Sequence, residues 1–348
     1  MLKTTLGALI LTPPLTLALL CHAAQAETLT VVSVGGLNKQ AQQQAFYRPF
    51  EQQHSMTIRA GEYNGEIGMI KAMVETGSVG WDVVEVDHAD IQRGCDEGLF
   101  ERLPAMPDVA QNDFIEGALS ECGVGIFIWS TALAYNPKAV AKAPTGWADL
   151  WDLKTFPGKR ALHKGAKLTL EIALMADGVP RDQVYTVLRE ADGVDRAFRK
   201  LEQIKQQIQW WESGAQPLQW LAAGDVAMTS VYTARAVSAQ QAGYDFPLVW
   251  DGNLYDMDSW GIVKGSPNVP AALQFIAFAS QPAQQKQFAE IMHNGPTHKQ
   301  TLALIAPETQ RNFPTAPQNL ALALKVDSDF WIEHGQELEE RFNAWAAR

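Results

Sequence analysis

The apolar positions of residues 27–135 follow two alternating periods, one typical of buried strands and one of amphipathic helices. Strands are expected at residues 29–34, 56–59 and 80–86. Helices are expected at residues 39–54, 64–76 and 91–100. Strands that alternate with helices in this rhythm indicate βαβ units and a mostly parallel sheet. The pattern therefore predicts an α/β protein.

Two apolar runs differ from this rhythm. Residues 125–135 form a β-rich run that is too long for an ordinary strand, and residues 259–263 form a second, shorter run. Both are expected to cross between two lobes, each a mostly parallel sheet flanked by helices. Lobe 1 then comprises residues 27–130 and 258–310, and lobe 2 comprises residues 131–257 and 311–348. Such lobes close on a ligand by hinge motion.

The pattern between and after the two crossings completes this architecture. Strands are expected at residues 158–162, 209–212 and 226–231, and helices at residues 147–151, 168–176, 184–190, 196–207, 217–223, 270–279, 282–292 and 329–346. In α/β sheets, ligands bind outside the carboxyl ends of the strands, which directs attention to the residues that follow each strand.

Residues 1–26 have the pattern of an export signal rather than of a folded element. Lys3 precedes the apolar run 6–20, and Ala24-Gln25-Ala26 matches a cleavage site. Cys21 allows a lipoprotein reading, but Leu20 stands where a small residue is expected. No later stretch has the length of a membrane span. We expect a periplasmic, monomeric protein that is not inserted in the membrane.

Composition narrows the possible functions. The 348-residue chain has a formal net charge of −11, which disfavours nucleic acid as a partner, since phosphates require a basic surface. Cys95 and Cys122 remain after the signal, and an even pair in an oxidising compartment predicts a disulfide. Two free buried thiols are the alternative.

No catalytic, metal or cofactor motif is present. His293 and His298 have the wrong spacing for two ligands on one helical face, and no P-loop or G-x-S-x-G sequence occurs. A triad assembled from distant residues would leave no such motif, so a periplasmic hydrolase remains the alternative of another class.

The candidate site centres on residues 225–260. Arg235 follows a predicted strand at the start of a helix, and Asp256 and Asp258 precede the second crossing. A ligand with a carboxylate at one end and an ammonium at the other would satisfy both charges. The competing interpretations are a surface arginine, a capping aspartate at 258 and a solvated aspartate at 256.

Further candidates surround these charges. Asp87 could contact an amine or only cap a helix, and Gly35-Gly36 could admit an anion or only form a tight turn. Tyr63, Tyr232 and Tyr255 could wall the cleft, since each has an apolar face and a polar tip. Lys167 could assist a carboxylate, although a surface lysine is the simpler interpretation. Trp129 and Trp260 are expected to serve packing.

The chain resembles bacterial periplasmic solute-binding proteins of the spermidine/putrescine type, the receptors of ABC importers. The resemblance covers nearly all of the chain after the signal. It rests on the motifs Gly80-Trp-Asp-Val-Val, Phe127-Ile-Trp-Ser-Thr-Ala-Leu-Ala-Tyr-Asn, Thr145-Gly-Trp-Ala-Asp-Leu-Trp, Ala223-Gly-Asp-Val-Ala-Met and Tyr255-Asp-Met-Asp-Ser-Trp-Gly-Ile-Val. It implies the two-lobed type II periplasmic-binding-protein fold with a ligand cleft at the hinge, and importer permease subunits as partners.

The departures from polyamine receptors point to a different ligand. By this resemblance, acidic residues are replaced by Gly35-Gly36 and by residues 163–167, and a stacking aromatic is replaced by Ser230, while Asp258 is retained. Family members that bind γ-aminobutyrate use an arginine and a downstream aspartate, similar to Arg235 and Asp258. The resemblance therefore implies a small ω-amino acid, such as γ-aminobutyrate or 5-aminovalerate, with a polyamine (putrescine or spermidine) as the alternative.

Overall fold

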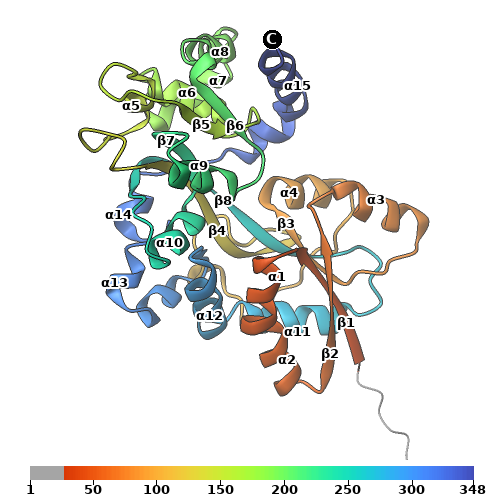
Figure 1. The fold of residues 1–348 in the computed structure, drawn as a ribbon. Helices are drawn as coiled ribbons and strands as arrows, with labels where there is room; N and C mark the ends of the chain where they lie inside the picture. Colours follow the sequence, from red (N-terminus) through yellow and green to blue (C-terminus); the bar gives the residue numbers. More distant parts are fainter. Residues whose placement is uncertain (1–26) are drawn as a thin grey trace, which may run out of the picture.

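The computed structural model describes residues 27–348, so the predicted export signal lies outside the described residues. Two α/β lobes are joined by long extended strands (Figure 1). Lobe 1 contains β1 (Glu27–Val34), α1 (Leu37–Gln42), a π-helical turn (Gln43–Tyr47), α2 (Arg48–Gln53), β2 (Met56–Tyr63), α3 (Ile67–Thr76), β3 (Val83–Asp87) and α4 (His88–Asp96). β1 pairs in parallel with both β2 and β3. Its apolar side chains on both faces, such as Val31 and Val32, are buried.

Lobe 2 repeats this arrangement. It contains α5 (Trp147–Trp151), β5 (Arg160–His163), α6 (Thr169–Ala176), α7 (Val184–Leu188), α8 (Gly193–Glu202), β6 (Ile208–Trp211), α9 (Gln216–Ala223), β7 (Met228–Tyr232) and α10 (Thr233–Gln241). β5 pairs in parallel with β6 and β7. In both lobes the central strand therefore has parallel neighbours on each side, as the pattern predicts.

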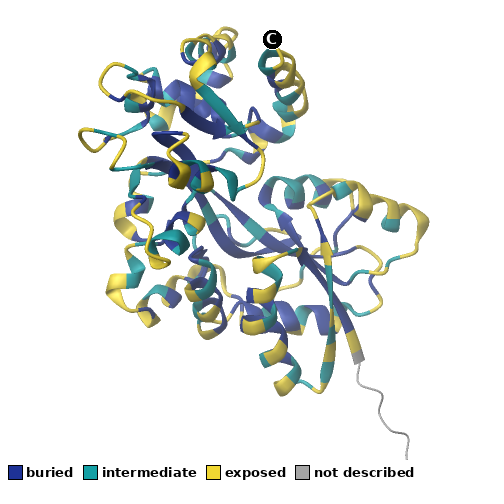
Figure 2. Cartoon of the chain, in the orientation of Figure 1, coloured by how far each residue is buried: buried dark blue, intermediate teal, exposed yellow. Residues whose placement is uncertain are grey.

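The lobes share one continuous sheet. β4 (Gly123–Tyr135) and β8 (Leu248–Ile262) run antiparallel through both lobes and give the strand order β2-β1-β3-β8-β4-β7-β5-β6. Most of their residues are buried, and both strands are dark blue over much of their length in Figure 2. The predicted α/β fold class is confirmed, with antiparallel pairing confined to the crossing strands and their partners.

The second crossing is longer than its apolar run. We expected it at residues 259–263, with Asp256 and Asp258 before its start, but β8 already begins at Leu248. Asp and Asn disfavour strands, and here the pairing with β3 and β4 overrides that preference. Since side chains alternate along a strand, Asp256 and Asp258 project from the same face.

A third connection runs beside the hinge. After β8 come α11 (Val269–Ala279), α12 (Pro282–Met292), β9 (Gly295–Pro296), α13 (Pro307–Gln310), α14 (Pro317–Leu320), β10 (Leu324–Lys325) and α15 (Ser328–Ala346). β10 pairs in parallel with β8 at Leu254 and Tyr255. The expected lobe bounds already required the chain to return to lobe 2 after residue 310, but no strand was predicted there, because a two-residue strand has no detectable period.

The hydrophobic cores follow the two lobes. Phe330, Trp331 and Phe342 of α15 pack with α6 and α8 in one core, while β1, α11 and the first half of β4 share another. The assignment of residues 311–348 to lobe 2 stays a prediction. The boundaries at 130/131 and 257/258 fall within β4 and β8 and stay a prediction. Within residues 27–348, no helix has the length and hydrophobicity needed to cross a membrane.

The predicted disulfide is confirmed. Cys95, near the end of α4, is bonded to Cys122, just before β4, with 5.8 Å between the Cα atoms. The two cysteines are 27 positions apart in sequence. The disulfide therefore closes a loop that contains the irregular segment between α4 and β4.

Replacing both cysteines by alanine should lower the free energy of unfolding by about 3–4 kcal/mol, because the open loop gains entropy in the unfolded chain. Urea denaturation of both proteins measures the difference. Dithiothreitol should destabilise the wild type and leave the double variant unchanged. Equal urea midpoints for the wild type and the double variant without dithiothreitol would contradict a stabilising role of the disulfide.

Candidate functional site

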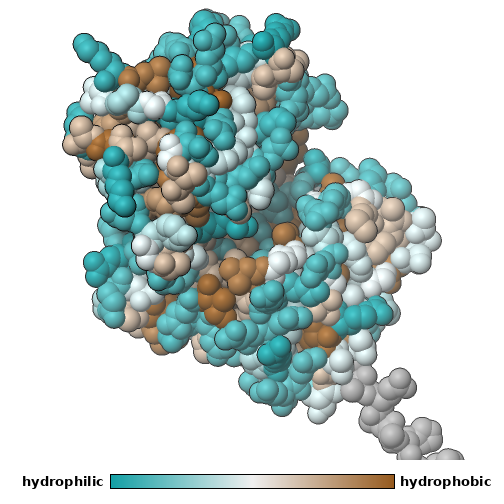
Figure 3. Space-filling model, viewed as in Figure 1, coloured by the Kyte–Doolittle hydropathy of each residue, from teal (hydrophilic) through white to brown (hydrophobic). Residues whose placement is uncertain are grey.

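A hollow opens between the two lobes, visible in the space-filling view (Figure 3). It contains a cavity of about 470 Å³ and a neighbouring one of about 450 Å³, which share Trp129, Tyr232 and Arg235. We call these two cavities together the cleft. Their further lining residues include Val34, Gly35, Gly36, Leu37, Asn38, Tyr63, Asn64, Glu85, Asp87, Asp90, Phe127, Asp258, Met292 and Asn294.

The sheet topology explains why these residues meet. Val34, Tyr63 and Asp87 are the last residues of the parallel strands β1, β2 and β3, and Tyr232 is the last residue of β7. The carboxyl ends of the strands in both lobes therefore border the cleft, as expected for ligand sites in α/β sheets. The crossing strands supply Trp129 and Asp258.

Lobe 2 contributes a fixed positive charge. Arg235 is the third residue of α10, whose first turn contains no acidic residue. Gly214 leaves room for it, since a Cβ at that position would lie 2.8 Å from Arg235 Nε. Among the described residues, Arg235 forms no ion pair. The positive end of the helix dipole adds to this charge, so this wall of the cleft favours an anion.

The opposite wall carries carboxylates. Trp129 Nε1 donates to Asp258 Oδ1 at 3.1 Å, which orients this side chain. Burial, together with the charge of Glu85, raises the pKa of Asp258 well above its usual range. Burial also raises the pKa of Glu85, against the opposing effect of hydrogen bonds donated by Asn38 and Gln42. Because two crowded carboxyl groups resist full ionisation, this wall favours an incoming cation.

Lys167 reaches the same region from lobe 2. Its Nζ lies 3.1 Å from Asp256 Oδ2 and 3.4 Å from Asp87 Oδ2. Burial and the charge of Asp87 raise the pKa of Asp256 to about 7 despite the nearby lysine. Asp87 also accepts from the backbone N–H of Ala89 at 3.0 Å and so caps α4.

Most residues predicted from the sequence line the cleft. They are Gly35, Gly36, Tyr63, Asp87, Tyr232, Arg235 and Asp258. Asp256 is buried beneath this surface and paired with Lys167. The tyrosines differ in setting, since Tyr63 donates to the backbone carbonyl of Glu85 whereas Tyr232 meets Trp129 edge-on at 6.0 Å between ring centroids.

Two predicted positions lie elsewhere. Ser230 is fully buried and accepts hydrogen bonds from Trp211 Nε1 and the backbone N–H of His163, each at 3.2 Å, so it faces the interior of lobe 2. Tyr255 lies on the face of β8 opposite Asp256 and packs on the lobe 1 core. Ser230 was proposed from the family resemblance and Tyr255 from its neighbours in sequence, whereas alternation along a strand separates adjacent side chains.

The sequence reasoning missed several lining residues. Glu85 was passed over although a charged residue in an otherwise apolar strand is itself a signal. Trp129 was assigned to packing. Lys167, which pairs with the lining residue Asp87 without lining the cleft itself, was assigned to the surface. Asn38, Asp90, Met292 and Asn294 carry no signal that sequence reasoning could have used, because only the fold brings them together. Within residues 27–348, no group of three or more His, Cys, Asp or Glu side chains is arranged to hold a metal ion.

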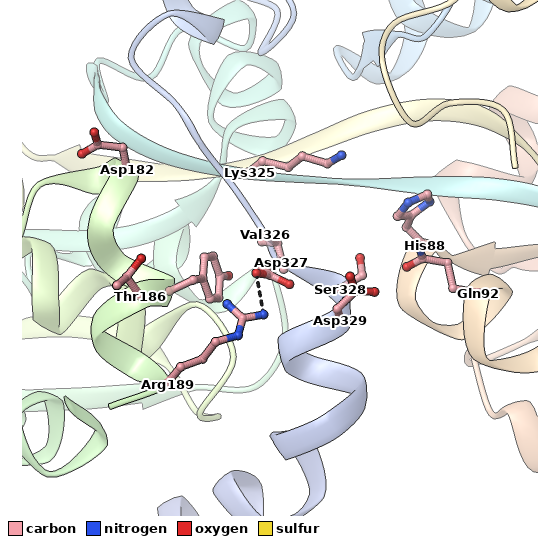
Figure 4. A pocket seen from close by; sticks show the side chains of 11 residues that line it. His88, Gln92, Asp182, Thr186, Arg189, Lys325, Val326, Asp327, Ser328 and Asp329 are labelled. Atoms are coloured by element: carbon pink, nitrogen blue, oxygen red, sulfur yellow. Dashed lines mark ion pairs between the residues drawn. The ribbon is translucent and has the colours of Figure 1, made fainter. Parts of the chain in front are cut away.

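A second hollow of about 520 Å³ lies between α4, α7 and the start of α15 (Figure 4). His88 and Gln92 lie on one side and Arg189 on the other, with Asp327 between them. Although this hollow is larger than either single cavity of the cleft, its arginine already pairs with Asp327 at 2.8 Å. Arg235 has no acidic partner within residues 27–348, which makes the cleft the stronger candidate site.

Comparisons with known proteins agree with the fold. A sequence profile for the family described as bacterial extracellular solute-binding protein matches residues 45–315. The chain is 55% identical over 327 residues to a gamma-aminobutyric acid-binding protein of Pseudomonas aeruginosa, covering 93% of this chain and 92% of that protein. It is 27% identical over 186 residues to the spermidine/putrescine-binding periplasmic protein of Escherichia coli, covering 52% of this chain and 51% of that protein.

Solved structures show the same architecture. The Atu4243-GABA receptor matches with a TM-score of 0.85 and 32% identity, covering 92% of this chain and 98% of that chain. MotA from A. tumefaciens B6, solved in complex with glucopine, matches with a TM-score of 0.81 and 30% identity, covering 92% of this chain and 99% of that chain.

Proposed function

This chain belongs to the bacterial extracellular solute-binding proteins, and we propose that it is the periplasmic receptor of an ABC importer for a small ω-amino acid such as γ-aminobutyrate or 5-aminovalerate. One observation carries the choice of ligand: Arg235, which has no acidic partner among the described residues, and the crowded carboxylate of Asp258 line one cavity. A zwitterion supplies the missing partner to each.

The two charged ends have separate roles. Arg235 binds the ligand carboxylate, because a guanidinium donates two parallel hydrogen bonds that match carboxylate geometry. Asp258 accepts from the ligand ammonium, while Trp129 and Tyr232 enclose the carbon chain between them. With each charged hydrogen bond contributing about 1.5–3 kcal/mol, the total is consistent with micromolar affinity, about −8 kcal/mol.

The relatives support this ligand class. The 55% identity to the gamma-aminobutyric acid-binding protein extends over nearly the whole of both chains, whereas the spermidine/putrescine-binding protein matches about half of each at 27%. In our proposal the lobes close about the hinge strands β4 and β8 and present the ligand to importer permease subunits. Membership of the solute-binding family supports a receptor role over the hydrolase considered above.

A polyamine is the second candidate, because the cleft retains more carboxylates than the sequence comparison suggested. Glu85, Asp87 and Asp258 line one cavity. Arg235 in the same cavity argues against this candidate, since it would repel a second ammonium.

A thermal-shift panel tests the proposal. Ligands that bind only the native state raise its stability by RT ln(1 + [L]/Kd), about 2.7 kcal/mol at one hundred times Kd. We expect γ-aminobutyrate or 5-aminovalerate to raise the melting temperature, and putrescine, spermidine and butyrate to leave it nearly unchanged. Butyrate is the matched control that lacks the ammonium. A shift with putrescine and none with either ω-amino acid would overturn the zwitterion proposal.

A further inference from the structure

Lys167 joins the two sides of the cleft through its ammonium. It lies in the loop between β5 and α6 of lobe 2, while Asp87 ends β3 of lobe 1 and Asp256 belongs to the crossing strand β8. The distances of 3.1 Å to Asp256 and 3.4 Å to Asp87 make it an ion-pair partner of both. The Asp256 side chain is only 1% exposed, so water cannot replace this cation.

This cation lies beside the position proposed for the ligand ammonium. Asp87 of β3 lies opposite Asp258 of β8 in the antiparallel sheet register. Asp256 precedes Asp258 by two residues and projects from the same face of β8. Two residues along a strand span about 6–7 Å, a length similar to that between the nitrogens of a four-carbon diamine. Lys167 Nζ also lies 5.8 Å from the ring centre of Trp129, whose indole N–H holds Asp258.

On the basis of the proposed function, we infer that Lys167 is a specificity-determining residue, whose ammonium takes the place that the second ammonium of a diamine would need. With Lys167 present, Asp87 and Asp256 are neutralised from within the protein, and Asp258 remains for one ligand ammonium. A diamine would bring a further positive charge against Lys167, where the carboxylates of Asp87 and Asp256 are already paired. Selectivity then depends on this repulsion as much as on the attraction by Arg235.

The electrostatic setting keeps Lys167 charged. Burial disfavours its ammonium, but the nearby carboxylates of Asp87 and Asp256 outweigh burial and raise the pKa of Lys167. Removing the lysine would take this cation from both carboxylates, and leaving the buried charge of Asp256 unpaired is costly. A diamine could then supply the missing charge.

The test compares K167M with K164M by calorimetric titration of the purified protein with γ-aminobutyrate and with putrescine. Methionine keeps most of the length of lysine and removes its charge. Lys164, in the same loop, pairs with Glu212 at 2.6 Å on the surface and serves as the matched control. We expect the affinity for putrescine relative to γ-aminobutyrate to rise at least about tenfold in K167M, or about 1.4 kcal/mol. K164M should keep the wild-type ratio.

Two more variants separate specificity from structural support. K167R keeps the charge and should keep the wild-type preference. The double variant K167M/D256N removes one uncompensated carboxylate and should lose most of the putrescine gain, which a merely structural lysine would not produce. K167Q replaces K167M as the neutral variant if circular dichroism shows that K167M is unfolded.

An unchanged ratio in a folded neutral variant would overturn the inference, as would a folded variant that binds neither ligand, since Lys167 would then only hold the lobes. A wild type that binds no ω-amino acid would instead refute the proposed function. In that case, a higher affinity of K167M than of the wild type for putrescine would still support the role of Lys167. Failure of the proposed function and failure of the inference about Lys167 are therefore distinguishable.

Discussion

Replacing Arg235 by alanine should abolish measurable binding of γ-aminobutyrate, with an affinity loss of roughly 100- to 10,000-fold. The estimate assumes two charge-assisted hydrogen bonds of about 1.5–3 kcal/mol each. The guanidinium has no acidic partner among the described residues, so its removal breaks no ion pair there. The stability of the unliganded protein should therefore change by only about 0.5 kcal/mol or less. Calorimetric titration and urea denaturation measure the two quantities.

R199A is the matched control, because Arg199 is an exposed arginine on α8 of the same lobe. It should retain wild-type affinity. R235K should recover only part of the loss, since an ammonium cannot reproduce the two-point geometry of a guanidinium. Wild-type affinity in R235A would remove Arg235 from the site.

Replacing Asp258 by asparagine should weaken γ-aminobutyrate binding roughly 10- to 100-fold, because the ligand ammonium loses its charged acceptor. Asparagine preserves the shape of the side chain and can still accept from Trp129. The unliganded variant should be more stable than the wild type at neutral pH. Since folding raises the pKa of Asp258, its contribution to stability is present below the unfolded pKa and is lost as the pH rises through the folded pKa.

The same linkage predicts how affinity changes with pH. A ligand ammonium requires the charged form of Asp258, so wild-type affinity should increase as the pH rises toward the raised pKa of this group. The D258N variant should show a flatter profile. D251N is the matched control on the same strand, because Asp251 is exposed and pairs only with Arg181 at the surface. A wild-type affinity that falls with rising pH would contradict the role of Asp258.

The fold was largely predictable because its signals are local. The buried strands β1, β3 and β4 are apolar runs, and α15 has its own helical period, so their positions follow from neighbouring residues. β8 was predicted only in part, because aspartates interrupt its pattern and the pairing with β3 and β4 determines its length. β10 is too short to show a period.

The candidate site was predictable where chemistry coincides with the end of a strand. Arg235, Asp87 and Tyr232 follow or end predicted strands, and their side chains meet at the cleft for that reason. Ser230 and Tyr255 lie outside the lining of the cleft, because the face of a strand from which a residue projects depends on register, and a shift of one residue reverses it.

By itself, the sequence determined the α/β class, the two-lobed plan, the disulfide and the presence of one arginine and one aspartate suited to a zwitterion. The tertiary structure alone decided which charges are already used within the protein. Lys167 and Asp256 are 89 positions apart in sequence but form an ion pair at 3.1 Å, whereas Arg235 forms none among the described residues. Electrostatic pairing depends on distance in space, and no local pattern encodes that distance.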